Sequence, residues 1–104
     1  MIISPSADDV RRLLRQVQEP SLGEDVVELG LVYEVWIGEG GYVHVNMTSP
    51  QPGSAGADHL ALQVRDALLA GLPGSRVEVS VVADPRWEPA MMTDAVRRRL
   101  ALPE

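Results

Sequence analysis

The sequence predicts an α+β fold, a two-layer αββαβα arrangement in which a three-stranded mixed sheet packs on helices. Segments whose apolar residues recur at helical spacing are interspersed with short segments that alternate apolar and polar residues, and Gly/Pro clusters separate them. A sheet with one apolar face cannot bury that face alone, so the helices are expected to cover it. With 104 residues, we expect a single domain over residues 1–104 with its core at about 7–100.

The first element is expected to be a helix over residues 7 to 18. Ser6 is a suitable N-cap, and Asp9 lies at the position of a capping box. The helical spacing is carried by Val10, Leu13, Leu14 and Val17. Pro20 cannot continue a helix, so a loop over residues 19 to 25 is expected to follow.

A β-hairpin is predicted from residues 26 to 37 and 42 to 48, around a glycine-rich turn. Pairing Ile37 with Gly41 leaves a three-residue loop and keeps the apolar side chains together. This register places on the core face Tyr33, Val35, Ile37, Val43, Val45 and Met47. The opposite face then carries Glu34, Trp36, Tyr42, His44 and Asn46.

The second half of the chain predicts a helix, a strand and a short final helix. Apolar residues recur at helical spacing from 55 to 70, and residues 76 to 82 alternate as in a strand. A right-handed crossover is expected to bring this third strand beside the first strand and parallel to the second. Thr93 and Asp94 are expected to cap a helix that ends near Leu100.

Composition excludes several classes of function. The net charge of −6 disfavours sequence-independent binding to nucleic acid. All nine basic residues are Arg, so lysine-dependent phosphate binding and Schiff-base chemistry are excluded. The chain has no Cys and therefore offers no thiolate. No apolar run approaches the ~20 residues needed to span a bilayer, and no signal peptide is evident, so we expect a cytoplasmic protein.

Four segments carry motifs that point to one family. Residues 19 to 33, EPSLGEDVVELGLVY, match the pattern D-P-E-L-G-x-x-(I/V)-V-(D/E)-L-G-L-(I/V)-Y. Residues 47 to 55, MTSPQPGSA, correspond to M-T followed by T-P-G-C-P, with QVR at 63 to 65. Residues 84 to 92, DPRWEPAMM, match D-P-P-W-x-P-x-M-M. The chain thus resembles the iron–sulfur cluster assembly domain family of SufT and PaaD proteins over residues 10 to 100.

The resemblance implies a role in maturing iron–sulfur proteins or assembling oxygenases, without an established turnover reaction. It also implies a pocket formed by Glu19, Leu22, Glu28, Thr48, Gln51, Gly53, Ser54 and Trp87. The family's cysteine stands where this chain has Ser54. A serine hydroxyl stays protonated near neutrality and binds soft metals poorly, so thiolate ligation of a cluster is lost. Glu19 retains a carboxylate, whereas Ser21 removes the next acid of the pattern.

Other interpretations of the polar residues remain open. Ser54 has the pattern of a helix N-cap; as a nucleophile it would need His59 and Asp58, which lie too close in sequence to build a triad within one helix. Metal-ligand chemistry is available from His44 and His59 with Asp58, Glu19 or Glu28. Their spacing is not that of a metal-binding motif, so we predict no metal and no cofactor. The amides around residues 53 to 56 suit an unspecific anion.

Surface residues suggest how such a protein meets its partners. Trp36, Tyr42 and His44 share the outer sheet face, where they either stabilise the hairpin or contact a partner. Residues 97 to 99 are three Arg at a helix end and are expected to be solvated, and Trp87 is expected to lie over the sheet in the core. We therefore predict a non-enzymatic accessory protein that contacts client proteins or a second copy of itself. The alternatives are an interaction module without a metal role and, least favoured, a hydrolase.

Overall fold

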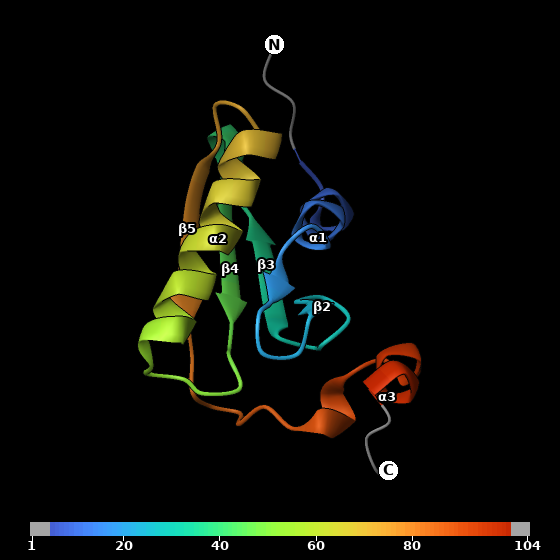
Figure 1. The fold of residues 1–104 in the computed structure, drawn as a ribbon. Helices are drawn as coiled ribbons and strands as arrows, with labels where there is room; N and C mark the ends of the chain where they lie inside the picture. The colour runs from blue at the N-terminus through green and yellow to red at the C-terminus, as the bar shows by residue number, and fades with distance from the viewer. Residues whose placement is uncertain (1–4, 101–104) are drawn as a thin grey trace.

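The predicted α+β fold is confirmed. The structure is a computed structural model that describes residues 5–100. Its elements are α1 (Ala7–Leu14), β1 (Gln18–Glu19), β2 (Glu24–Asp25), β3 (Val32–Ile37), β4 (Tyr42–Met47), α2 (Ala55–Gly71), β5 (Arg76–Val81) and α3 (Asp94–Leu100). The main sheet has the order β3-β4-β5 (Figure 1), with β4 antiparallel to β3 and parallel to β5. Among residues 5–100, no helix is long and apolar enough to cross a membrane.

Helix α1 begins as predicted but ends four residues early. The capping box at Ser6 is present, because the Ser6 hydroxyl accepts from the Asp9 amide and the Asp9 carboxylate accepts from the Ser6 amide. At the other end the Val17 amide bonds to the Leu14 carbonyl at 3.0 Å, which tightens the last turn. Val17 then becomes buried, and its carbonyl accepts from the Val26 amide, so the predicted continuation to residue 18 was wrong.

The segment predicted as a loop contains a small hairpin. Gln18 pairs with Asp25 and Glu19 with Glu24, so β1 and β2 form a separate two-stranded sheet. Strands of two residues carry no detectable alternation, and sequence periodicity gave no signal for them. Gly23 closes the turn with φ +71°.

Residues 26 to 30 form a turn, although the sequence predicted a strand there. The Asp25 carboxylate accepts from the amides of Val27 and Glu28, both at 2.9 Å, and its carbonyl accepts from Leu29. This local capping competes with strand pairing because it satisfies the same backbone donors. The run of apolar residues reflects burial, since Val26 and Leu29 are fully enclosed.

The hairpin register differs from the prediction in two ways. Ile37 opposes Val43 rather than Gly41, and the three-residue loop is residues 39 to 41. The partner of Ile37 moved by two residues, so the side chains kept their predicted faces. A bulge between Val32 and Glu34 makes Val32 the partner of Met47, which removes Tyr33 from the row that the sequence predicted.

Strand β5 lies beside β4, which corrects the predicted position beside the first strand. Helix α1 packs against β3 and α2, while α2 packs against β5, so the two helices share one face of the sheet (Figure 1). With α1 already over β3, the crossover through α2 returns next to β4. The core between helices and sheet contains Val10, Leu14, Val43, Val45, Met47, Leu60, Val64 and Leu68.

Gly30 shows how closely the C-terminal segment approaches the 26–30 turn. Its φ is +74°, and a Cβ at this position would lie 2.2 Å from the carbonyl oxygen of Met91. Gly30→Ala is therefore expected to destabilise the fold by about 2 kcal/mol or more, because backbone strain and a steric clash add. Gly23 has a similar φ but open space around it, so Gly23→Ala should lower the free energy of unfolding by only about 1 kcal/mol. Urea denaturation of both variants measures the difference; equal losses would contradict the close approach.

Candidate functional site

Segments distant in sequence meet at the end of the sheet where β4 and β5 finish and β3 begins (Figure 1). The Thr48 amide donates to the Leu31 carbonyl at 2.8 Å, and the Thr48 hydroxyl donates to the Val82 carbonyl at 2.6 Å. Thr48 is fully buried, so its side chain joins the loop of residues 48 to 54 to the segment after β5. Of the predicted pocket residues, this loop carries Thr48, Gln51, Gly53 and Ser54.

Ser54 is the N-cap of α2. Its hydroxyl group accepts a hydrogen bond from the Ala57 amide at 3.1 Å and donates one to the Gln51 carbonyl at 2.7 Å. Gly53 precedes it with φ +84°, which lets the loop turn into the helix. The hydroxyl donates its proton to this carbonyl and not to an imidazole, as a serine nucleophile would require. His59, the predicted base, is exposed on α2. The arrangement is that of a cap.

Glu19 uses its carboxylate within the β1–β2 hairpin. One of its oxygens accepts from the Leu22 amide at 2.8 Å and from the Ser21 hydroxyl. The residue is only 8% exposed, so these donors compensate its burial. Ser21, which replaces an acid of the family pattern, thus serves as a donor to the acid that remains. Leu22 is half-buried against the core.

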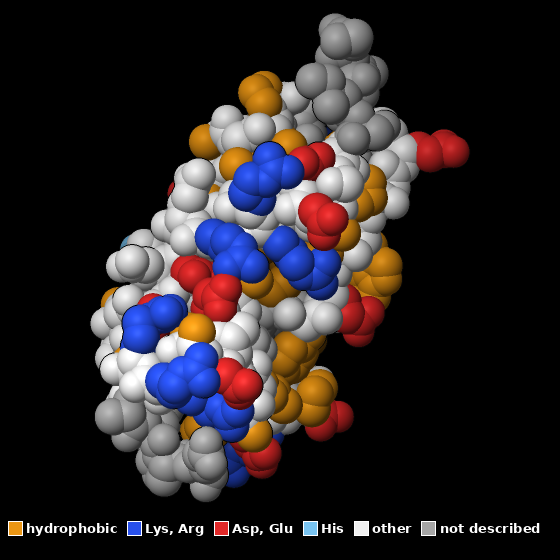
Figure 2. Space-filling model, turned by 90° about the vertical axis from the view of Figure 1, so that its right-hand side faces the viewer, with side chains coloured by type: hydrophobic (Ala, Val, Ile, Leu, Met, Phe, Trp, Pro, Cys, Tyr) orange, Lys and Arg blue, Asp and Glu red, His pale blue; other side chains and the backbone are white. Residues whose placement is uncertain are grey.

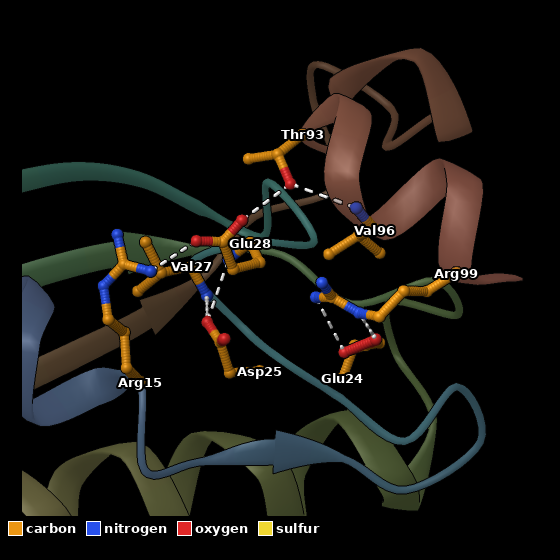
Figure 3. Close-up of polar contacts among 8 residues, drawn as sticks. All are labelled: Arg15, Glu24, Asp25, Val27, Glu28, Thr93, Val96 and Arg99. Atoms are coloured by element: carbon orange, nitrogen blue, oxygen red, sulfur yellow. Dashed lines mark hydrogen bonds and ion pairs between the residues drawn. The ribbon is translucent and has the colours of Figure 1, made fainter.

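Glu28 links the 26–30 turn to the C-terminal segment (Figure 3). Its carboxylate accepts from the Thr93 hydroxyl at 2.6 Å and pairs with Arg15, while its carbonyl accepts from the Thr93 amide at 2.9 Å. The hydrogen bond from Thr93, followed by that from Arg15, holds the pKa of Glu28 below its usual value. Glu28 therefore stays ionised and fixes the start of α3.

A second ion pair anchors the far end of α3. Arg99 donates to both carboxylate oxygens of Glu24, at 2.7 and 3.3 Å, and this hydrogen bonding lowers the pKa of Glu24 (Figure 3). Arg97 is half-buried and pairs with Asp94. Arg98 and Arg99 are exposed, as predicted for a solvated helix end, but Arg99 also pairs with Glu24. The Arg99–Glu24 contact joins residues that are far apart in sequence, so no local sequence pattern predicts it.

Trp87 packs against the core, as predicted, and it also contacts the 26–30 turn. Its indole N–H donates to the Leu29 carbonyl at 2.8 Å, and the ring is half-buried. Sequence reasoning missed a second contact of this segment, in which the Tyr33 hydroxyl donates to the Pro85 carbonyl at 2.9 Å. An open groove of about 510 Å³ lies beside it. The groove is lined by Gly30, Val32, Tyr33, Glu34, Asn46, Val82, Asp84, Pro85 and Met91.

The outer sheet face carries the predicted aromatic cluster. The rings of Trp36 and His44 lie 5.1 Å apart, and those of Tyr42 and His44 lie 6.4 Å apart. The Tyr42 hydroxyl donates to Glu78 at 2.9 Å, which raises the pKa of the tyrosine, and His44 bonds to Ser80 at 3.0 Å. Trp36, on the edge strand β3, is the exposed ring of this cluster, with 44% of the residue accessible.

The charged groups do not build a metal centre or a basic patch in the described part of the chain. Within residues 5–100, no three His, Asp or Glu side chains converge on one point. Arginines over α1 and α3 are interspersed with acidic side chains (Figure 2), and four of them form ion pairs. This mixed surface offers no continuous positive stripe for a phosphate backbone.

The fold is that of a small α+β domain, and comparison with known proteins places it in a family. The model of the family described as "Iron-sulfur cluster assembly protein" matches residues 7–81. The chain therefore belongs to the iron–sulfur cluster assembly protein family, as the motifs indicated.

Curated relatives and a solved structure agree with this assignment. The chain is 40% identical over 81 residues to the Bacillus subtilis Fe-S protein maturation auxiliary factor YitW, covering 77% of the chain and 78% of that protein. It is 37% identical over 78 residues to the Staphylococcus aureus Fe-S protein maturation auxiliary factor SufT, covering 74% and 88%. The structure of a domain of unknown function from Bacillus anthracis matches with a TM-score of 0.85 at 30% identity, covering 92% of each chain.

The anchoring of α3 by Glu28 predicts a pH dependence. The folded-state pKa of Glu28 is depressed, so its stabilising effect is present above the unfolded value of about 4.3 and is lost as pH falls through the folded value. Glu28→Gln is expected to be about 1–2 kcal/mol less stable than the parent at pH 7, and the gap should narrow below about pH 4. Urea denaturation across this range is the measurement, with the exposed loop variant Glu39→Gln as control. A gap that is constant with pH would contradict the role of the Glu28 charge.

Proposed function

We propose that this protein is a non-enzymatic accessory factor in iron–sulfur cluster assembly or metalloprotein maturation, and that it acts by protein contact without ligating a cluster through a thiolate. Membership of the assembly family and the names of its relatives, which are maturation auxiliary factors, support the pathway. Its site of action is the cytoplasm, and its partners are client or pathway proteins rather than nucleic acid or membrane.

The observation that carries the mechanism is the residue at the family's cysteine position. Ser54 stands there, the whole chain has no Cys, and the Ser54 hydroxyl is occupied by its bonds to Ala57 and Gln51. A neutral hydroxyl is a poor ligand for iron, and this one already donates one hydrogen bond and accepts another. The surrounding frame is retained, since Thr48, Gly53 and the α2 N-terminus keep the loop in place. We propose this loop, with Glu19, Leu22, Glu28, Gln51 and Trp87, as the region that pathway proteins contact.

The outer sheet face supplies the second contact surface of the proposal. Trp36, Tyr42 and His44 lie together on the face that α1 and α2 leave uncovered, and large aromatic residues dominate binding energy at interfaces. The groove beside Tyr33 continues this face through Glu34 and Asn46, toward the family site. A client that docks on Trp36 would thus also reach the segments that meet at the sheet end.

Trp36→Ala tests this surface. In a strain that lacks the protein, we expect lower activity of enzymes that carry labile iron–sulfur clusters, restored by the parent chain but not by Trp36→Ala. Trp36→Phe keeps an aromatic ring and should retain most of the function. Thermal melts of both variants should stay close to the parent, because 44% of Trp36 is exposed and it lies outside the buried core. Unimpaired cluster enzymes in the deletion strain would refute the accessory role. A large loss of melting temperature in Trp36→Ala would instead assign the ring to hairpin stability.

Ser54→Cys tests the site itself. A thiol at this N-cap faces the positive end of the α2 dipole, so it should titrate below the ~8.5 of a free cysteine and gain affinity for soft metals. Loss of the hydroxyl cap should cost up to about 1 kcal/mol. The rate of iodoacetamide labelling against pH is the measurement, and Ser75→Cys, which precedes a strand, is the control.

The parent should develop no cluster absorbance with iron and sulfide. A stable chromophore in the parent would refute the proposed mechanism, and an unshifted rate profile in Ser54→Cys would refute the site.

A further inference from the structure

Strand β5 has an outer edge that no other part of the described chain pairs with (Figure 1). The Val82 amide donates inward, to the Met47 carbonyl of β4 at 2.8 Å. Backbone groups alternate in direction along a strand, so those of Val77, Val79 and Val81 point away from β4. Three sets of N–H and C=O groups are therefore available for pairing along this edge.

The side chains beside this edge are apolar and incompletely covered. Val77, Val79 and Val81 lie in the same row as Val43 and Val45 of β4, which are fully buried, yet all three are only half-buried. Helix α2 runs over the sheet and leaves the outermost strand partly open. A groove of about 470 Å³ follows, lined by Val79 and Val81 of β5 and Asp58, Ala61, Leu62 and Arg65 of α2.

Leu62 is the apolar centre of this groove, because 54% of it is exposed. An exposed leucine alone needs no explanation, but here it adjoins a free strand edge with half-buried valines. The two edges of the sheet differ: β3 carries a bulge, whereas β5 keeps a regular register with β4 and has neither a bulge nor a proline. Neither a bulge nor a proline therefore blocks pairing at the β5 edge, whose charged residues are Arg76 and Glu78.

The charges around Leu62 indicate which partner fits. Asp58 and Arg65 are exposed and lie with Ala61 and Leu62 on one face of α2, since these positions are three or four residues apart. Asp58 precedes Leu62 by about one turn, and Arg65 follows it by about one turn. A two-fold axis through Leu62 would place each Asp58 opposite Arg65 of a second copy. A self-complementary patch of this kind is the requirement for an isologous interface.

The strand register agrees with the same axis. In an antiparallel pair centred on Val79, Val77 lies opposite Val81 of the second copy, and Glu78 lies opposite Ser80 of the second copy. No like charges face each other in this register, whereas centring the pair on Glu78 would oppose two carboxylates. Helix and strand are thus complementary about one axis.

We propose that the chain forms a symmetric dimer in which β5 pairs antiparallel with β5 of a second copy and the two α2 helices pack at Leu62. The two sheets become one continuous sheet of about six strands, and the β5 edges are no longer exposed. The Trp36 face of each copy remains open, so the dimer presents two client surfaces and does not compete with them. This inference is independent of the proposed function.

Sedimentation equilibrium tests the proposal. The parent should be dimeric, and Leu62→Glu should raise the dissociation constant by at least about tenfold, because two carboxylates enter an apolar contact. Gln63→Glu adds the same charge at the next position of α2, which is exposed and does not line the groove. It should leave the dissociation constant unchanged. A parent that is monomeric at millimolar concentration overturns the proposal. So does a dimer that survives Leu62→Glu, or one that Trp36→Ala disrupts while Leu62→Glu does not.

A charge exchange tests the symmetry. Asp58→Arg and Arg65→Asp should each weaken the dimer about threefold or more, because each variant homodimer opposes two like charges across the axis. An equimolar mixture of the two variants should restore association. In that heterodimer the two arginines of one variant chain face the two aspartates of the other, so opposite charges replace like charges at both contacts. Failure of the mixture to associate more tightly than either variant alone would overturn the two-fold arrangement.

Hydrogen exchange supplies a readout that depends on the strand pairing alone. The amides of Val77, Val79 and Val81 should exchange slowly at high protein concentration and faster on dilution, whereas the Val82 amide is protected within one chain at any concentration. If the amides of all three valines exchange at rates independent of concentration while the protein dimerises, the β5 edge is not the interface.

Discussion

The 26–30 turn and Leu31, which follows it, accept hydrogen bonds from two segments that are far away in sequence. The candidate site depends on these contacts. The Leu31 carbonyl accepts from the Thr48 amide, and the Leu29 carbonyl accepts from the Trp87 indole. Gly30 lets the backbone of Met91 approach to a distance that any side chain would prevent. Asp25 caps the turn from within. One buried turn thus determines where both the 48–54 loop and the C-terminal segment lie.

A hydrogen bond and an ion pair then hold the last helix against the same turn and β2. Glu28 and Glu24 hold the two ends of α3 through Thr93 and Arg99 (Figure 3). A helix of seven residues is too short to be stable by itself, so its position comes from these contacts and from the burial of Val96. The charged groups of this region are therefore explained by structure, without recourse to catalysis.

At the N-terminus of α2 this chain keeps a helix cap but lacks the cysteine of the family pattern. Ser54 occupies the N-cap where the family pattern has a cysteine, and the cap hydrogen bond preserves the loop geometry. What changes is the ligand, because oxygen replaces sulfur. The exposed Trp36 on the outer sheet face is the feature that suits the proposed action through protein contact.

The sequence by itself determined the fold class, the family and the cap at Ser54. These depend on local patterns: helical spacing in α2, alternation in β4 and β5, and motifs whose glycines and prolines set the turns. The pairing of Ile37, the bulge that displaces Tyr33, and the position of β5 beside β4 were decided by the tertiary structure. So were the Arg99–Glu24 and Thr93–Glu28 contacts. Each of these joins groups that are distant in the chain, and a local pattern carries no information about which distant groups meet when the helices compete to cover one sheet face.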